Sequence, residues 1–260
     1  MTLWQGILLG LVQGLTEFLP VSSSGHLVLV EALSGVHFTD VTVEVSLHVA
    51  TLGSVLVVYG RRLWQIIRGV VRGDRPSLQY AALLVIASLP AGVIGLLFRH
   101  QIEERFHSLF WLGIQFIITG AILLATRGVR GERTVPTPAA AGVIGCAQAF
   151  AILPAVSRSG ATLAAALKSG LSPAAAAEFS FLMAIPVIAA AGVLEGKDAV
   201  LNLAQIGAVP WAASFVVAFA AGVWSIRLLV RLIRDGRFYL FAPYCFAVGL
   251  LTLAYALWHG

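Results

Sequence analysis

Apolar residues run along this chain in long stretches instead of alternating with polar residues. A helix that spans a membrane needs about 20 mostly apolar residues, and six stretches approach that length. These stretches cover residues 42–60, 79–98, 109–126, 174–194, 205–226 and 239–258. The pattern therefore predicts an all-α integral membrane protein with six transmembrane helices.

Two more apolar stretches, residues 1–34 and 138–169, are each interrupted in the middle by a short polar segment. The interruptions read Pro20-Val-Ser-Ser-Ser-Gly25 and Pro154-Ala-Val-Ser-Arg-Ser-Gly160. Irregular backbone is tolerated at membrane depth only where it is buried in protein or lines a wet cavity. We therefore expect each stretch to form a re-entrant helical hairpin with a polar tip.

The two interrupted stretches resemble each other when one is shifted along the chain by a constant interval. At that shift Gly10, Gln13, Ser22, Ser24 and Gly25 recur as Gly145, Gln148, Ser157, Ser159 and Gly160. We expect a single membrane domain, residues 1–260, made of inverted repeats at approximately 1–134 and 135–260. In folds of this kind, broken helices build a binding site near the membrane midplane.

The overall composition supports a membrane protein. Apolar residues make up 59% of the chain and charged residues 11%, whereas soluble domains have about 45–50% and about 25%. These values exclude an ordinary cytosolic enzyme and a disordered chain. Cys146 and Cys245 both lie in apolar runs, which argues against a disulfide scaffold. The segment before Pro20 lacks a positively charged start, so we expect it to belong to the fold and not to a removed signal peptide.

The basic residues gather in a few places along the chain. Twelve of the 17 are arginines in three expected short loops, at residues 61–75, 127–133 and 227–237. The positive-inside rule places these loops in the cytoplasm and the balanced connections at 99–105 and 195–198 outside. The net charge of +5 is then explained by topology and by contact with anionic membrane lipid, and no nucleic acid is expected.

Polar side chains at the two tips are the candidate functional residues, because such residues are costly inside a membrane. Each Ser-x-Ser-Gly turn is expected to begin a helix, whose first backbone N–H groups favour phosphate. The planar guanidinium of Arg158 also suits phosphate oxygens. The predicted diphosphate-binding residues are Ser22, Ser24, Gly25, Ser157, Arg158, Ser159 and Gly160.

The first tip also carries groups that suit phosphoryl transfer. Ser23 and His26 are separated by a single helical turn and share one face of it, so the imidazole can accept the hydroxyl proton while Ser23 attacks phosphorus. Gln13 and Glu17 offer oxygen ligands for a divalent cation, Mg²⁺ or Ca²⁺, that offsets phosphoryl charge. The predicted catalytic residues are Glu17, Ser23, His26 and Arg158.

Each of these residues also has a simpler structural explanation. Serine and glycine are common where membrane helices pack closely, and a lone histidine at a helix start is more often a hydrogen-bonding group than a catalyst. The combination of Glu17, His26 and Arg158 on two facing tips favours a functional site. Weaker candidates are Glu44, His48, Gln148, Lys168 and Glu178.

The two interruptions, with the residues around them, resemble signatures of a known family. The run Gln13-Gly-Leu-Thr-Glu17-Phe-Leu-Pro-Val-Ser-Ser-Ser-Gly25-His26 is similar to the first signature of the undecaprenyl-diphosphate phosphatases, also called bacitracin-resistance proteins. Leu153-Pro-Ala-Val-Ser-Arg-Ser-Gly-Ala-Thr162 resembles their second signature, PGxSRSG. The segment from Glu178 to Pro186 also looks like the family's downstream sequence, so the resemblance covers the whole chain.

This resemblance implies hydrolysis of undecaprenyl diphosphate to the monophosphate and inorganic phosphate. Such hydrolysis recycles the lipid carrier of peptidoglycan and other envelope polymers and confers bacitracin resistance. The resemblance further implies a bacterial inner-membrane protein with a site open to the periplasm and a divalent cation. It carries site roles over to Glu17, Ser22, Ser23, His26, Ser157 and Arg158. Ser23 is the favoured nucleophile, with His26 as the alternative, and a homodimer is one possible oligomeric state.

Two positions depart from the family pattern. Gln13 stands at the first position of an E/QxxxE motif that many members fill with glutamate, and it offers an oxygen without a charge. Ala155 replaces the glycine of PGxSRSG, which argues against a positive φ there. The competing hypothesis is a transporter or flippase of an anionic lipid that uses the same tips. Ser23 close to His26 favours the enzyme, because transport needs no nucleophile.

Overall fold

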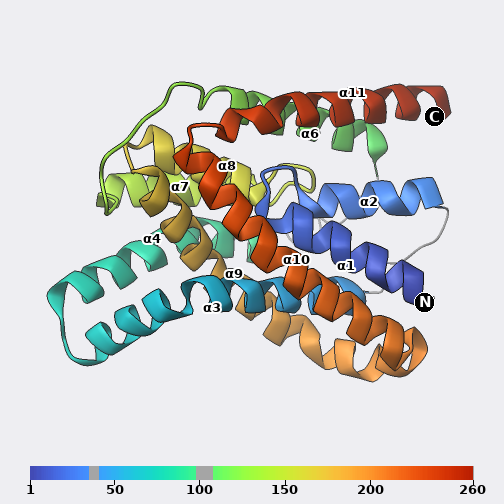
Figure 1. Ribbon diagram of the computed structural model, residues 1–260, viewed down its shortest axis with the longest axis horizontal. Coiled ribbons are helices and arrows are strands. Elements are labelled where there is room, and N and C mark those ends of the chain that lie inside the picture. Colours follow the sequence, from blue (N-terminus) through green and yellow to red (C-terminus); the bar gives the residue numbers. More distant parts are fainter. Residues whose placement is uncertain (35–40, 98–107, 260) are drawn as a thin grey trace.

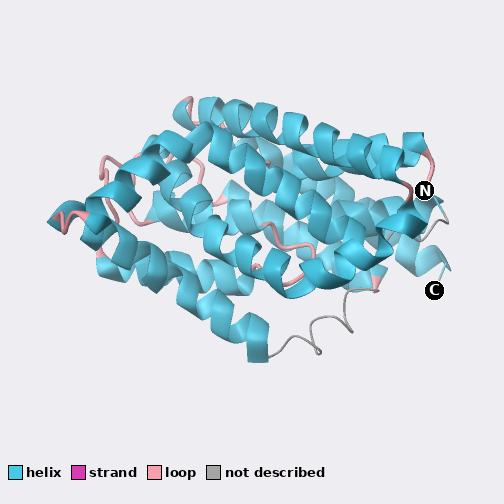
Figure 2. Cartoon of the chain, turned by 90° about the horizontal axis from the view of Figure 1, so that it is seen from below, coloured by secondary structure: helices cyan, strands magenta, loops and turns pink. Residues whose placement is uncertain are grey.

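The computed structural model describes residues 1–34, 41–97 and 108–259, and the regular structure among them is helical (Figure 1). Figure 2 shows the helices joined by short loops. The elements are α1 (Leu3–Phe18), α2 (Ser23–Ser34), α3 (Val41–Val71), α4 (Arg75–Leu97), α6 (Leu109–Leu124), α7 (Pro138–Phe150), α8 (Arg158–Lys168), α9 (Pro173–Ile206), α10 (Ala208–Arg234), the 3₁₀ turn η1 (Phe238–Phe241) and α11 (Ala242–His259). The all-α prediction is confirmed.

Several of these helices are apolar and long enough to cross a membrane. Among the described residues, length and composition suffice in Arg75–Gly95, Pro173–Ala190, Ala208–Arg234 and Phe238–Trp258. Leu109–Leu124 and Pro138–Phe150 are shorter apolar helices. Large apolar side chains such as Leu251, Leu257 and Trp258 lie exposed on α11, as expected for a surface that faces lipid. The chain is thus a multi-helix membrane protein.

The predicted polar connections are in large part wrong, because helices continue through them. α3 extends to Val71 and α10 to Arg234, so most arginines of the first and third predicted loops are helical. α9 also continues through residues 195–198 and gives way to α10 at Gly207, where φ is +89°. A helix satisfies its own backbone hydrogen bonds and need not end where the membrane does. The connection predicted at 99–105 lies outside the described residues.

Both predicted interruptions are confirmed as breaks between two helices. α1 ends at Phe18 and α2 begins at Ser23, while α7 ends at Phe150 and α8 begins at Arg158. Proline disfavours the helical conformation in the residue before it, and Leu19, which precedes Pro20, is extended at φ −62° and ψ 143°. Pro20 therefore helps to place the first break where the sequence suggests it, whereas α7 ends at Phe150, before Pro154 is reached.

The helices that precede the two breaks pack in matching ways. α1 packs on α10, and α7 packs on α4. The shift that relates the two sequence stretches also carries the start of α1 onto the start of α7, and the start of α2 onto that of α8. Figure 1 shows α1 and α2 in one half of the molecule and α7 and α8 in the other, with the breaks meeting between them. The sequence shift thus relates two helix–break–helix segments of the structure, and the inverted repeat stays a prediction.

A glycine lies at a close contact in each of these two helix pairs, α1 on α10 and α7 on α4. A Cβ at Gly10 would collide with the carbonyl oxygen of Ser214 on α10, and one at Gly145 would lie 2.7 Å from that of Ala87 on α4. These two glycines are equivalent positions of the two stretches. The backbones of each pair approach so closely that no side chain fits, as is common in membrane helix packing.

We expect Gly10→Val to lower the stability of the protein by about 1–3 kcal/mol, because the added carbons force α1 and α10 apart. The measurement is the midpoint of thermal unfolding in detergent. Gly142→Val is the matched control, since a Cβ at this position on α7 meets nothing within 4 Å. An equal loss in both variants would contradict the explanation by close contact.

Candidate active site

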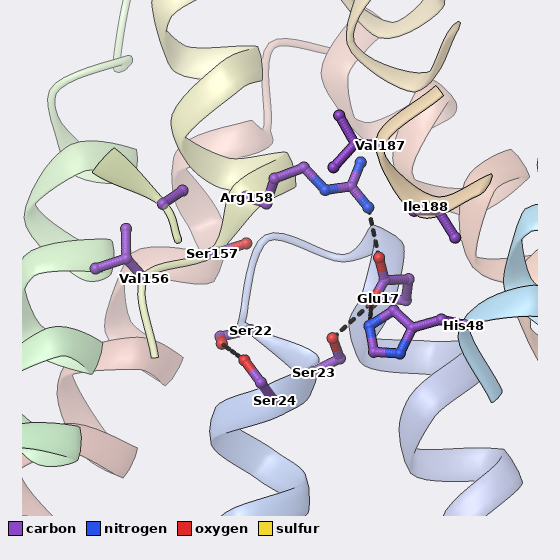
Figure 3. A pocket seen from close by; sticks show the side chains of 11 residues that line it. Glu17, Ser22, Ser23, Ser24, His48, Val156, Ser157, Arg158, Val187 and Ile188 are labelled. Atoms are coloured by element: carbon purple, nitrogen blue, oxygen red, sulfur yellow. Dashed lines mark hydrogen bonds and ion pairs between the residues drawn. The ribbon is translucent and has the colours of Figure 1, made fainter. Parts of the chain in front are cut away.

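A cavity of about 260 Å³ lies where the two breaks meet (Figure 3). Its polar wall comes from both tips and from α3, and its apolar wall from α9 and the end of α7. The lining residues are Glu17, Ser22, Ser23, Ser24, His48, Ala151, Val156, Ser157, Arg158, Val187 and Ile188. The structure therefore brings the two tips into one site, as the sequence predicts.

Glu17 is the centre of the polar contacts in this cavity. It is only 8% exposed, and its Oε1 accepts a hydrogen bond from Arg158 Nη2 at 2.5 Å. Its Oε2 accepts from Ser23 Oγ at 2.6 Å and from Gln13 Nε2 at 3.1 Å. His48 Nε2 lies 3.7 Å from the same oxygen. One carboxylate thus links the expected nucleophile to the expected phosphate ligand.

The backbone turn before α2 directs Ser23 toward Glu17. Ser22 has φ +68° and is the one non-glycine residue with positive φ in the part of the chain that the structure describes. Its Oγ accepts from the backbone N–H of Gly25 at 3.3 Å and donates to the carbonyl of Pro154 at 2.9 Å. Ser24 also donates to the Pro154 carbonyl. The first tip is therefore fixed by the second.

The second tip makes the equivalent hydrogen bond to the first tip. Ser159 Oγ donates to the carbonyl of Leu19 at 3.3 Å. In the alignment of the two stretches, Ser159 is the equivalent of Ser24, and Leu19 is the equivalent of Pro154. The two tips thus exchange equivalent hydrogen bonds, which holds the cavity together from both sides.

α6 supports the second tip from behind, which the sequence analysis did not anticipate. Gln115 Oε1 accepts from the N–H of Ala155 at 2.8 Å. Thr119 Oγ1 donates to the carbonyl of Ala155 at 3.0 Å and accepts from the N–H of Ser157 at 3.1 Å. Both residues are buried. They are polar residues within an otherwise apolar helix, and this feature of the sequence could have identified them as candidates.

His26 does not make the predicted contact with Ser23. Its Nδ1 lies 2.6 Å from the carbonyl oxygen of Ser22, and its Nε2 lies 2.7 Å from the hydroxyl of Tyr244 on α11. His26 does not line the described cavity. The expected Ser23–His26 pair is therefore wrong for this structure, because the side chain turns back along α2 and Ser23 bonds to Glu17. A catalytic role for His26 stays a prediction.

The remaining predicted phosphate ligands divide into two groups. Ser22, Ser24 and Ser157 line the cavity. The N–H groups of Gly25 and Gly160 donate to the Oγ atoms of Ser22 at 3.3 Å and of Ser157 at 3.1 Å, so these are not the free donors that we predicted. The capping geometry explains this, since a serine at a helix start accepts from the second or third residue of the helix.

Of the weaker candidates, His48 faces the cavity. Glu178 instead accepts from Arg62 Nε at 2.9 Å and from the Tyr80 hydroxyl at 3.0 Å, and it is not among the cavity residues. Gln148 is 3% exposed, and its amide atoms have no hydrogen-bond partner in the described part of the chain. Lys168 ends α8, and the side chain of Glu44 lies outside the described residues.

Glu17 and Gln13, the residues predicted to hold a divalent cation, are in direct contact with each other. Gln13 Oε1 is buried and has no hydrogen-bond partner among the described residues, while the amide nitrogen of the same side chain reaches Glu17. Within these residues, no group of three or more His, Cys, Asp or Glu side chains is arranged to hold a metal. Mg²⁺ commonly binds one or two carboxylates together with substrate phosphates, and cation binding at Glu17 and Gln13 stays a prediction.

Comparison with known proteins identifies the family. The profile of the family described as "Bacitracin resistance protein BacA" matches residues 6–251. The chain is 41% identical over 270 residues to the undecaprenyl-diphosphatase of Desulfosudis oleivorans, covering 96% of this chain and 97% of that protein. It is 38% identical over 268 residues to undecaprenyl-diphosphatase 1 of Shouchella clausii, covering 98% and 97%. With both signatures facing one cavity, the chain belongs to the BacA family of bacitracin resistance proteins.

Proposed function

We propose that this protein is a membrane phosphatase that hydrolyses undecaprenyl diphosphate to the monophosphate and inorganic phosphate. The main observation behind this proposal is that Glu17 accepts hydrogen bonds from both Ser23 and Arg158 inside a cavity built from the two tips. The relatives named undecaprenyl-diphosphatase match nearly the whole chain. In the cell this activity recycles the lipid carrier for peptidoglycan and other envelope polymers.

Arg158 is suited to clamp the terminal phosphate. Its Nη2 bonds Glu17, while its Nη1 is buried without a hydrogen-bond partner in the described part of the chain. The guanidinium thus keeps a donor for a phosphate oxygen, and the planar fork suits phosphate geometry. Ser22, Ser24 and Ser157 line the same cavity and remain the predicted serine ligands of the diphosphate. To donate to a phosphate oxygen, Ser22 and Ser24 must release the Pro154 carbonyl, which accepts from both hydroxyls.

Ser23 is the proposed nucleophile and Glu17 the proposed base. The Ser23 hydroxyl already donates to Glu17 Oε2 at 2.6 Å, which is within the range required for proton transfer. As Oγ bonds to the terminal phosphorus, its proton passes to Glu17 and the bond to the bridging oxygen breaks, which releases the lipid monophosphate. Water then attacks the phosphoserine, and the serine oxygen leaves with the proton held by Glu17. Inorganic phosphate is released, and Ser23 and Glu17 return to their starting protonation states. His26 is turned toward Ser22 and Tyr244 and does not take the place of Glu17 in this arrangement.

Glu17 and Gln13 would hold the proposed cation, Mg²⁺ or Ca²⁺, which would offset the negative charge of the diphosphate when bound. We expect Gln13→Glu to bind the cation about tenfold more tightly, because a second carboxylate then faces Glu17. The measurement is Mn²⁺ binding followed by electron paramagnetic resonance, together with the cation dependence of phosphate release. Unchanged Mn²⁺ affinity would place the cation elsewhere.

The proposed topology has six transmembrane helices, α3, α4, α6, α9, α10 and α11, and two re-entrant hairpins, α1–α2 and α7–α8. The matched packing of α1 on α10 and of α7 on α4 supports an inverted repeat. The arginines at 61–75, 127–133 and 227–237 then lie on the cytoplasmic side of the bacterial inner membrane, and the cavity opens toward the periplasm. A homodimer stays a prediction.

The first test is release of phosphate from undecaprenyl diphosphate by the purified protein in detergent, with and without Mg²⁺ or Ca²⁺. We expect release that depends on the cation. Detergent removes the two compartments that transport requires, so release there separates hydrolysis from the transport hypothesis. The relatives' names favour hydrolysis, and a well-folded protein that releases no phosphate would contradict it.

A further inference from the structure

The turn that orients Ser23 is under backbone strain. Ser22 sits at φ +68°, a conformation that costs a non-glycine residue about 1–2 kcal/mol. Such a residue persists only when its surroundings hold it in place. Its side chain is held by Gly25 and Pro154, and its carbonyl is held by His26.

His26 closes the turn with two bonds to one carbonyl. The oxygen of Ser22 accepts from the backbone N–H of His26 at 3.3 Å and lies 2.6 Å from its Nδ1. A carbonyl can only accept, so Nδ1 carries the hydrogen. The neutral imidazole then presents Nε2 as an acceptor, and the Tyr244 hydroxyl 2.7 Å away donates to it. The tyrosine therefore fixes the tautomer that the turn needs.

The rings also fix the orientation of the imidazole. Tyr244 stacks nearly parallel to His26, with ring centroids 5.7 Å apart and an interplanar angle of 6°. Phe116 on α6 meets His26 edge-on at 5.3 Å. α6 and α11 pack against each other, so two joined helices hold the ring from two sides.

The second tip provides an internal comparison. In the alignment of the two stretches, Ser157 corresponds to Ser22 and Ala161 to His26. Ser157 has an ordinary φ of −66°, and alanine offers no imidazole to hold a carbonyl. We call the contact between the His26 imidazole and the Ser22 carbonyl the imidazole latch. The latch and the strained turn occur together on the tip that carries Ser23, and neither occurs on the tip that carries Arg158.

We infer that Tyr244 is a positioning residue, which acts through His26 to hold the Ser22 turn and so to aim Ser23 at phosphorus. This inference rests on the proposed phosphatase function. It assigns His26 a structural task in catalysis that needs no proton exchange with Ser23. Arg158 and the serines of the second tip do not contact this latch, but Ser22 belongs both to the latched turn and to the predicted diphosphate ligands. A weakened latch should therefore change KM, but by less than it changes the turnover number.

The expected result for Tyr244→Phe is a turnover number about fivefold lower, which corresponds to one lost hydrogen bond, with a smaller change in KM. The assay is phosphate release from undecaprenyl diphosphate in detergent. Tyr255→Phe, further along α11, is the matched control and should turn over as wild type does. Wild-type protein without activity would contradict the proposed function, whereas active wild type with an equally active Tyr244→Phe would overturn this inference alone.

Two kinds of His26 variant distinguish positioning from proton transfer. An asparagine amide nitrogen can take the place of Nδ1 and donate to Ser22, whereas glutamine places its amide nearer to Nε2. We expect His26→Asn to retain turnover within about tenfold of wild type, and His26→Gln and His26→Ala to lose about a hundredfold. Equal loss in all three variants would assign His26 to proton transfer and overturn the latch.

A double-mutant cycle tests whether Tyr244 acts through His26. In the His26→Ala background, Tyr244→Phe should cost no further turnover, since the acceptor of its hydroxyl is gone. A fivefold loss in both backgrounds would show that Tyr244 acts independently of His26, and the inference would then be wrong.

Discussion

Arg158→Ala is expected to lower phosphate release about a thousandfold, because arginine contacts to a transferring phosphoryl group have effects of that size or larger. The guanidinium bonds Glu17 at 2.5 Å and keeps a buried donor without a partner among the described residues. Arg158→Lys keeps the charge but loses the planar fork, so we expect an intermediate loss of about tenfold to a hundredfold. The measurement is kcat and KM for undecaprenyl diphosphate in detergent.

Arg158→Ala also leaves Glu17 buried without its positively charged partner. Breaking a buried ion pair by removing one partner costs about 3–5 kcal/mol of stability, so the unfolding temperature of Arg158→Ala should fall. Adding Glu17→Gln to that variant should restore stability but not turnover. This pattern separates the lost contact with substrate from damage to the fold.

Arg62→Ala is the matched control for an arginine that pairs with a glutamate. Arg62 bonds Glu178 at 2.9 Å, does not line the cavity and has a side chain that is 41% exposed. Its removal should leave turnover near the wild-type value. Turnover in Arg158→Ala close to that of Arg62→Ala would contradict the proposed binding of the terminal phosphate by Arg158.

The helices and their breaks were predictable because each follows from local sequence. Long apolar runs produce helices, and Pro20 and Pro154 stand at the two breaks. The predicted loops at the arginine clusters were wrong, because hydropathy indicates where the membrane ends and does not indicate where a helix ends. α3 and α10 continue through their arginines because nothing local stops them.

The site residues were identified from sequence, but their partners were not. Glu17, Ser23 and Arg158 stand on three helices, and only the folded chain shows that the carboxylate joins the other two. Spacing alone favoured His26 as the partner of Ser23, because helical periodicity cannot reveal that Tyr244 lies within reach of the imidazole. The supporting bonds from α6 to the second tip likewise depend on tertiary packing.

The way Ser23 is held determines what its removal should do. It is 9% exposed, and its hydroxyl donates to Glu17 at 2.6 Å, so Ser23→Ala removes both the nucleophile and one hydrogen bond of the carboxylate. We expect turnover to fall at least about a thousandfold, as for other enzymes that lose their nucleophile. KM should change little, because Arg158 and the other serines still bind the diphosphate.

A direct measurement of the intermediate completes this test. Acid quenching during turnover, followed by mass spectrometry, should show a phosphate on the peptide that contains Ser23 in wild type and none in Ser23→Ala. Ser88→Ala is the control, since this serine on α4 donates to the carbonyl of Leu84 and does not line the cavity; it should behave as wild type in both measurements. If Ser23→Ala kept most of its turnover, the attack on phosphorus would pass to His26 or to a water molecule, and Glu17 would lose its proposed role as the base that serves Ser23.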